Sequence, residues 1–252
     1  VEAVDLDGNG HLDLLVTNFE QERNNIYLNQ GDGIFHDRTD ALGLGTSSYG
    51  RLSWGVGSRD FNHDGTLDVF VANGHVYPQV DKIAGHLGYA QTDQLYLGSK
   101  SDGRLRFKEH PLGGKHVSRG AAFGDLDNDG DVDIVVCHLN DAPVVLENRV
   151  AQNNIAQGSS LILTLEQPSP NREALGARVR VRAGDLDRVA EVRRQSSFQC
   201  SHDRRLHFGL GKTAPAASAE VRWPDGSRER FELKPGGGFQ TLQKGQGTAD
   251  AR

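Results

Sequence analysis

The chain has 252 residues and a mass of 27.4 kDa, which is enough for one large domain or two ordinary ones. Hydrophobic residues make up 36% of it and the mean hydropathy is −0.54, which argues against a membrane-spanning helix of roughly 18 apolar residues. Residues 1–150 carry 23 acidic and 12 basic side chains, a net charge of −11, whereas residues 151–252 carry 11 and 16, a net charge of +5. This division indicates two differently built regions and disfavours nucleic acid as a partner, because the first region would repel a phosphate backbone.

A nine-residue acidic motif occurs three times in the first region. The copies are DLDGNGHLD at residues 5–13, DFNHDGTLD at residues 60–68 and DLDNDGDVD at residues 125–133. Each fits D-x-[D/N]-x-[D/N]-G-x-x-D and leads into a short apolar stretch, LLVTN, VFVAN or IVVCH. Such β-branched stretches are typical of buried strands. We therefore expect each motif to form a turn between two strands.

The spacing of the acidic residues predicts calcium binding. Calcium takes about six to eight oxygen ligands, and alternate residues of a tight loop point the same way. Positions 1, 3, 5 and 9 would supply side-chain oxygens, and position 7 its backbone carbonyl. The candidate ligands are Asp5, Asp7, Asn9, His11 and Asp13 in the first loop, Asp60, Asn62, Asp64, Thr66 and Asp68 in the second, and Asp125, Asp127, Asp129, Asp131 and Asp133 in the third. The sequence thus predicts about three calcium ions.

Two further features support this interpretation. Gly10, Gly65 and Gly130 occupy position 6, where a sharp turn requires a backbone conformation that a side chain would penalise. An EF-hand shares the first half of the spacing, but it requires Glu at position 12 and a following helix, and position 12 is valine in all three copies. One copy alone would fit an ordinary turn without metal. Three copies would hold ten unneutralised carboxylates at positions 1, 3, 5 and 9, which disfavours that alternative.

Hairpins are expected between the acidic loops. NIYLNQGDGIFHD at residues 25–37 and QLYLG at residues 94–98, followed by LRFKEH, carry turn residues at 31–33 and 101–103. A unit of roughly 60 residues with about four short strands matches one β-propeller blade. The order of acidic loop, apolar strand and NIYLNQGDGIF resembles FG-GAP/VCBS-type repeats, the propeller blades also found in integrin α subunits. The resemblance covers residues 1 to about 150 and implies that the nonapeptide loops bind calcium.

Three loops imply fewer blades than the four to eight of a closed propeller. The chain begins at Val1 without a signal-like segment, and we expect the first loop to lack its preceding strand. The resemblance therefore implies further blades upstream. We favour a piece of a longer protein over an open arc of blades or two chains that complete each other.

The second region shows short alternating segments after a polar connector. The connector is RVAQNNIAQGSS at residues 149–160, and SLILTLEQ, ARVRVRAG, VAEVRRQ, LHFGLG, AEVRWPDG and RERFELKPG follow it. In ARVRVR valine and arginine alternate, as in a strand with one buried face. Asp185 and Asp187 mimic the start of an acidic loop, but Arg188 and Val189 break the pattern, so we expect a hairpin turn there. The region is predicted to be an all-β module.

This module resembles the ASPIC/UnbV domain, which typically follows FG-GAP/VCBS-type blades. The resemblance is carried by Asn171, LGARVRV at residues 175–181, HDRRLHFGLG at residues 202–211 and VRWPDG at residues 221–226. It covers roughly residues 170–245. Cys200 departs from the small polar residue expected before HDRRLHFGLG. The family includes cartilage acidic protein-like and bacterial UnbV-like secreted proteins.

Several other sites are disfavoured. The ten histidines show no H-E-x-x-H motif and no paired Cys/His spacing, so we expect them on the surface or in the core and not on zinc. The sequence has no G-x-S-x-G motif, and Gly236–Gly238 lacks the Lys-Ser/Thr of a phosphate loop, so no catalytic residue is assigned. Trp54 and Trp223 are expected to pack in sheets and not to stack on sugars. Cys137 and Cys200 are expected to be free, mostly buried thiols.

These observations predict an all-β chain: a partial propeller of about three FG-GAP/VCBS-type blades plus a small C-terminal β-module. The expected domains are residues 1–150 with the three calcium loops, a connector at 151–160 and the ASPIC/UnbV-like domain at 161–248. The favoured function is non-enzymatic recognition of a protein or carbohydrate, in an extracellular, periplasmic or cell-surface setting with calcium stabilising the blades. The alternative, suggested only by the UnbV resemblance, is an enzyme or accessory protein of secondary metabolism that uses the propeller as a scaffold.

Overall fold

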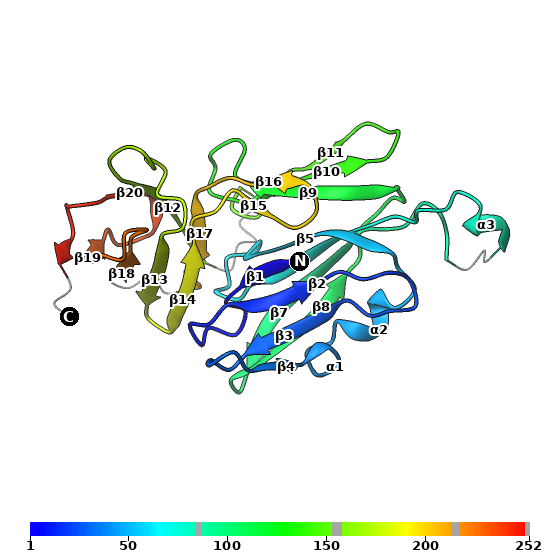
Figure 1. Ribbon diagram of the computed structural model, residues 1–252, viewed down its shortest axis with the longest axis horizontal. Helices are drawn as coiled ribbons and strands as arrows, with labels where there is room; N and C mark the ends of the chain where they lie inside the picture. Colours follow the sequence, from blue (N-terminus) through cyan, green and yellow to red (C-terminus); the bar gives the residue numbers. More distant parts are fainter. Residues whose placement is uncertain (84–86, 153–157, 213–216, 250–252) are drawn as a thin grey trace.

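The computed structural model describes residues 1–83, 87–152, 158–212 and 217–249. Within these ranges strands dominate, and three four-residue helices lie in connections: α1 (Thr39–Leu42), α2 (Gly45–Ser48) and α3 (Val80–Ile83). The all-β prediction is therefore confirmed (Figure 1). None of the helices in the described ranges is long and apolar enough to cross a membrane.

The first sheet has the strand order β1-β2-β3-β4 and is antiparallel throughout. Its strands are β1 (Glu2–Val4), β2 (Asp13–Val16), β3 (Asn25–Asn29) and β4 (Phe35–Asp37). The first acidic loop joins β1 to β2, so the expectation that this loop lacks a preceding strand is wrong. Three residues are too few for a periodic sequence pattern. The strand is held by the buried carboxylate of Glu2, which pairs with Arg59 at 3.0 Å.

The second and third sheets repeat this plan. The second has the order β5-β6-β7-β8, with β5 (Ser53–Arg59), β6 (Asp68–Asn73), β7 (Gln94–Ser101) and β8 (Arg104–His110). The third has the order β11-β10-β9, with β9 (Ser118–Gly124), β10 (Asp133–His138) and β11 (Val144–Leu146). The second and third acidic loops join β5 to β6 and β9 to β10, as predicted. Asp102 and Gly103 form the expected hairpin turn, with φ of 51° and 71°.

The three sheets pack face to face around β6, which is buried on both sides. Because side chains alternate along a strand, Val69 and Val71 enter the core shared with the first sheet. Phe70 and Ala72 enter the core shared with the third sheet, which contains Phe123. Within the described residues the three sheets do not close into a ring (Figure 1).

The C-terminal module is built from two further sheets. One has the order β17-β12-β20, with β12 (Ser160–Glu166), β17 (Leu206–Gly209) and β20 (Gly238–Gln243), and β12 and β20 are parallel. The other has the order β14-β13-β18-β19-β21, with β13 (Arg178–Ala183), β14 (Leu186–Glu191), β18 (Ala217–Arg222), β19 (Arg228–Leu233) and β21 (Thr248–Ala249). A two-stranded ribbon, β15 (Gln195–Ser196) and β16 (Cys200–Ser201), extends from the module.

The core of this module confirms the alternation predicted from the sequence. Val179 and Val181 of β13 are fully buried, while Arg182 of the same strand is exposed. Trp223 is 1% exposed and lies in the same core. The turn after it is closed by the N–H of Gly226, which donates to the Trp223 carbonyl at 2.8 Å. The predicted connector at 151–160 falls partly on residues 153–157, which lie outside the described residues.

Candidate metal centre

The three acidic loops fold in the same way. The position-1 aspartate accepts the N–H of the position-6 glycine in each loop, at 3.2 Å for Asp5 and Gly10, 2.8 Å for Asp60 and Gly65, and 3.2 Å for Asp125 and Gly130. The side-chain oxygens at positions 3 and 5 each accept the N–H two residues further on. The three glycines have φ of 88°, 88° and 95°, a region in which a side chain is strained. The same residue types at the same spacing therefore produce the same hydrogen-bonded turn.

The position-9 aspartate clamps each loop to its sheet. One carboxylate oxygen accepts the N–H of position 2, and the other accepts an N–H of the third strand or of a residue just beyond it. The pairs for the second oxygen are Asp13 with Asn29 at 2.7 Å, Asp68 with Gly98 at 2.8 Å, and Asp133 with Asn148 at 2.8 Å. The residues Asn29, Gly98 and Asn148 were not anticipated from the sequence. Asn29 and Gly98 each follow a Tyr-Leu pair, whereas Asn148 follows Leu-Glu, so the three positions share no simple sequence signal.

The structure brings the predicted side-chain ligands together in two of the loops. Carboxylate oxygens of Asp5, Asp7 and Asp13 lie within 4.8 Å of one another, and so do those of Asp125, Asp127 and Asp133. The second loop has Asn62 at position 3, and its amide donates to the Asp64 carboxylate at 3.2 Å. Asp60, Asp68 and Asp64 keep the backbone arrangement of the other two loops. Asn9 and Asp129, at position 5, are engaged in the turns described above.

The position-7 residues differ in a way the sequence did not predict. Position 7 was expected to contribute only its carbonyl, and His11 is indeed exposed. Thr66 and Asp131 are buried, however. One oxygen of Asp131 accepts the N–H of Ala151 at 3.0 Å, and the other lies 3.3 Å from Nε2 of His63 in the second loop. Asp131 thus brings the third loop into contact with the second.

The loop carboxylates are electrostatically suited to a cation. Burial raises the pKa of Asp13 to about 7, that of Asp60 to about 7 and that of Asp68 to about 8. Neighbouring loop carboxylates push the same three pKa values further up, while hydrogen bonds from backbone N–H groups pull them down. A divalent cation would stabilise the ionised forms, and every side-chain donor is a hard oxygen. The residues present therefore fit calcium.

The C-terminal module covers all three loops. The N–H of Val189 donates to Asp5 at 3.0 Å in the first loop, and Arg188 donates to the Gly65 carbonyl at 3.2 Å in the second. In the third loop, Arg205 donates to the Asp125 carbonyl at 2.5 Å. The sequence predicts the acidic loops as metal sites only. In the structure they also form part of the interface between the two regions.

Arg188 supplies positive charge inside this interface. Its side chain is only 5% exposed, and burial lowers the pKa of its guanidinium. The carboxylates of Asp60, Asp5 and Asp64 oppose that pKa shift. Arg188, which breaks the loop-like pattern in AGDLDRV, thus neutralises part of the negative charge of the first and second acidic loops. No local sequence signal identifies this role, because the two regions are far apart in the chain.

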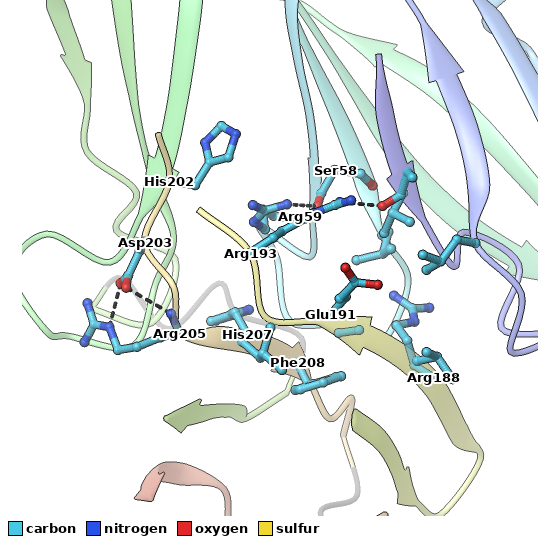
Figure 2. Close-up of a pocket in the computed structure, with 17 residues that line it drawn as sticks. Ser58, Arg59, Arg188, Glu191, Arg193, His202, Asp203, Arg205, His207 and Phe208 are labelled. Atoms are coloured by element: carbon cyan, nitrogen blue, oxygen red, sulfur yellow. Dashed lines mark hydrogen bonds and ion pairs between the residues drawn. The ribbon is translucent and has the colours of Figure 1, made fainter. Parts of the chain in front are cut away.

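A cavity of about 70 Å³ lies in the same interface (Figure 2). Arg59 and Arg193 on its wall donate to Glu2 at 3.0 and 3.4 Å, and Arg205 donates to Asp203 at 2.5 Å. The pKa of His202 is lowered by burial to about 4, so its imidazole is neutral at pH 7. These charged groups already have partners in the protein, and the cavity is part of the domain interface.

The cysteine and tryptophan predictions have mixed outcomes. Both thiols are free, but Cys137 is exposed and Cys200 is half-buried, so the prediction of mostly buried thiols is wrong. Cys137 is the second-last residue of β10 and the exposed one in that strand. Trp54 packs edge-on against Phe198 and its indole N–H donates to the Gly74 carbonyl at 2.8 Å, as expected for a structural tryptophan.

Comparison with known proteins supports the assignment of both regions. The family pattern of the FG-GAP-like repeat matches residues 5–71 and 80–136. The family pattern described as ASPIC and UnbV matches residues 167–249. A search of curated proteins finds no match for this chain. The resemblance inferred from the sequence is therefore confirmed, and the chain belongs to the proteins in which FG-GAP-like repeats are followed by an ASPIC/UnbV domain.

Proposed function

We propose that this chain is a calcium-stabilised recognition module without catalytic activity, in which the three sheets act as blades of a partial propeller. The observation that carries the proposal is the shared framework of the acidic loops. The first and third loops each gather three carboxylates within 4.8 Å, and the second loop retains the same backbone hydrogen bonds. We further propose that the protein acts outside the cytoplasm, where calcium concentrations suit modest-affinity loops.

The loops would couple metal binding to domain position. Bound calcium would offset the negative charge of the clustered carboxylates. The position-1 aspartates are held by backbone N–H groups, and Asp5 is also held by Val189 of the C-terminal module. The position-9 aspartates fix each loop to the third strand of its sheet or, in the third sheet, to Asn148 just beyond that strand. Ordering of the loops would therefore stabilise both the sheets and the interface between the two regions.

A partner would meet the opposite end of the sheets, which we call the free end. Each loop joins the first two strands at the covered end, so β2, β6 and β10 run away from the C-terminal module and finish at the free end. Large apolar side chains are exposed in the connections there: Phe19, Tyr77, Ile83 and Leu139. Exposed apolar groups among polar ones are typical of protein-binding surfaces. We propose a protein partner at this end, and a carbohydrate is the other candidate.

Calcium titration of loop variants tests the proposal. Asp127→Ala removes a candidate ligand that is exposed and whose other contact is one turn hydrogen bond. We expect the parent chain to bind about three calcium ions and the variant about two, with a smaller calcium-induced rise in Tm. Asp185→Ala is the matched control, because Asp185 is an exposed acidic residue in a sequence that mimics a loop. Equal calcium stoichiometry and equal Tm shifts in all three proteins would contradict the proposal.

The alternative, an enzyme or accessory protein of secondary metabolism, makes a different prediction. It requires a small-molecule ligand, and activity that persists after all calcium has been removed. The cavity in the domain interface is the place to look for such a ligand, but three of its four arginines already donate to carboxylates of the protein. Detection of a bound metabolite by mass spectrometry of the native protein would favour the alternative.

A further inference from the structure

Two histidines and an aspartate from separate segments lie together at the free end of the third sheet. The rings of His116 and His138 are stacked, with centroids 4.1 Å apart and planes 7° from parallel. One ligand atom from each ring and one carboxylate oxygen of Asp141 lie within 4.8 Å of one another. Nδ1 of His116 is 3.9 Å from Oδ2 of Asp141, which is too long for a hydrogen bond.

The backbone that carries these side chains is held firmly. His138 is the last residue of β10, which pairs with β9. Just beyond it, the N–H of Leu139 donates to the Val117 carbonyl at 2.9 Å. His116 and Gln91 exchange two backbone hydrogen bonds, at 2.8 and 3.0 Å. The two rings therefore come from a fixed backbone, which limits the entropy lost when they bind a ligand.

The hydrogen bonds around the cluster leave ligand atoms free. Nδ1 of His138 lies 3.0 Å from the Ala142 carbonyl, which only accepts hydrogen bonds. Nδ1 therefore carries the proton and Nε2 keeps its lone pair in the neutral ring. A hydrogen bond of this kind is typical of metal-binding histidines, because it fixes both the tautomer and the ring orientation. Oδ1 of Asp141 accepts the Ala142 N–H at 2.8 Å, which leaves Oδ2 facing His116.

We propose that His116, His138 and Asp141 bind a divalent transition-metal ion of the zinc class. The ligands would be Nδ1 of His116, Nε2 of His138 and Oδ2 of Asp141. Zinc takes histidine nitrogens and carboxylate oxygens at about 2.0–2.2 Å in a tetrahedral arrangement, so the two rings must leave their parallel stacking and rotate toward each other to converge on one ion. The side chains of Asp141 and His116 are 67% and 36% exposed, which allows this movement and leaves further coordination positions open to solvent.

The donor set separates this site from the acidic loops. Imidazole nitrogen prefers zinc, copper and nickel, whereas a site made only of oxygen suits calcium. The loops lie at the covered end of the sheets and the histidine cluster at the free end. The two kinds of metal would therefore occupy different sites. The sequence has no closely spaced pair of zinc-binding residues that includes both histidines. Strand pairing instead brings the two histidines together from different segments.

Zinc titration in saturating calcium tests this proposal, because calcium then occupies any site in the acidic loops. The experiment uses the full chain with Cys137→Ser, so that the exposed thiol does not bind zinc. We expect one zinc ion per chain by calorimetry, and visible absorption of a low-coordinate ion when cobalt replaces zinc. His138→Gln should abolish saturable binding, and Asp141→Asn should weaken it at least tenfold.

The controls separate the proposal from its competitors. His36→Gln removes an exposed histidine of the first sheet and should leave zinc binding unchanged. Asp141→Asn changes an exposed side chain, so it remains informative if His138→Gln fails to fold. Failure of the parent to bind zinc, or unchanged binding in both variants, would overturn the proposal. Loss of zinc binding only in Asp127→Ala would also overturn it, because the ion would then occupy an acidic loop.

Discussion

Gly209 is the point at which the C-terminal module comes closest to an acidic loop. A Cβ atom added to it would lie 1.8 Å from Oδ2 of Asp60, 2.5 Å from Cγ of Asp60 and 2.9 Å from Cα of His63. Non-bonded Cβ atoms essentially never approach another heavy atom within 3.0 Å, so Gly209→Ala requires a shift of about 1 Å. Asp60 is buried and held by the N–H of Gly65, so it cannot simply rotate away.

Overpacking of this kind destabilises a protein by about 1–3 kcal/mol, and we expect Gly209→Ala to fall in that range. Backbone strain does not contribute, because Gly209 is not among the glycines with positive φ. Urea unfolding of the calcium-loaded proteins measures the change in the free energy of unfolding. Gly50→Ala is the control: a Cβ there meets no atom within 4 Å, and the change should be neutral or stabilising by about 0.4–1 kcal/mol. If Gly209→Ala were as stable as Gly50→Ala, the inferred packing of the module on the second loop would be wrong.

Three further predictions follow from charge and exposure. Arg188→Gln should lower the Tm more in EDTA than in calcium, because bound calcium would replace part of the lost positive charge near the loops. In EDTA, the free energy of unfolding should fall as pH rises from about 6.5 to 8. The pKa values of Asp13 and Asp68 are raised to about 7 and 8 in the folded protein, so the folded protein binds more protons than the unfolded chain in this range. Saturating calcium should flatten that slope, and the same slope with and without calcium would contradict the charge argument. Cys137 should react with iodoacetamide well before Cys200, because Cys137 is exposed and burial raises the pKa of Cys200; mass spectrometry of the alkylated peptides distinguishes the two orders.

Local sequence patterns predicted much of the fold because each pattern acts within a few residues. The acidic nonapeptides form turns between strands because Asp, Asn and Gly satisfy the backbone within the loop itself. The Asp102–Gly103 hairpin and the alternation of Val179 and Val181 with arginines likewise depend on neighbouring residues. The short strand β1 was missed for the same reason, since a pattern of three residues carries little information.

The candidate site was predicted only in part. The residue types and their order in each loop were readable, but the second contact of each closing aspartate lies on a distant strand. The contact between Asp131 and His63 joins two different loops. The exposure of Cys137 depends on which face of β10 is covered. These features have no local signal, because they arise from packing between segments.

The amino-acid sequence by itself determined the all-β class, the three acidic turns, the alternating strands and membership of the FG-GAP-like and ASPIC/UnbV families. These properties follow from side-chain periodicity and turn chemistry, which act over distances of a few residues. Only the tertiary structure decided that Arg188 lies buried among the loop carboxylates and that His116 stacks on His138. Both arrangements depend on the relative placement of whole sheets, which is set by burial of apolar surface summed over the core and not by any short motif.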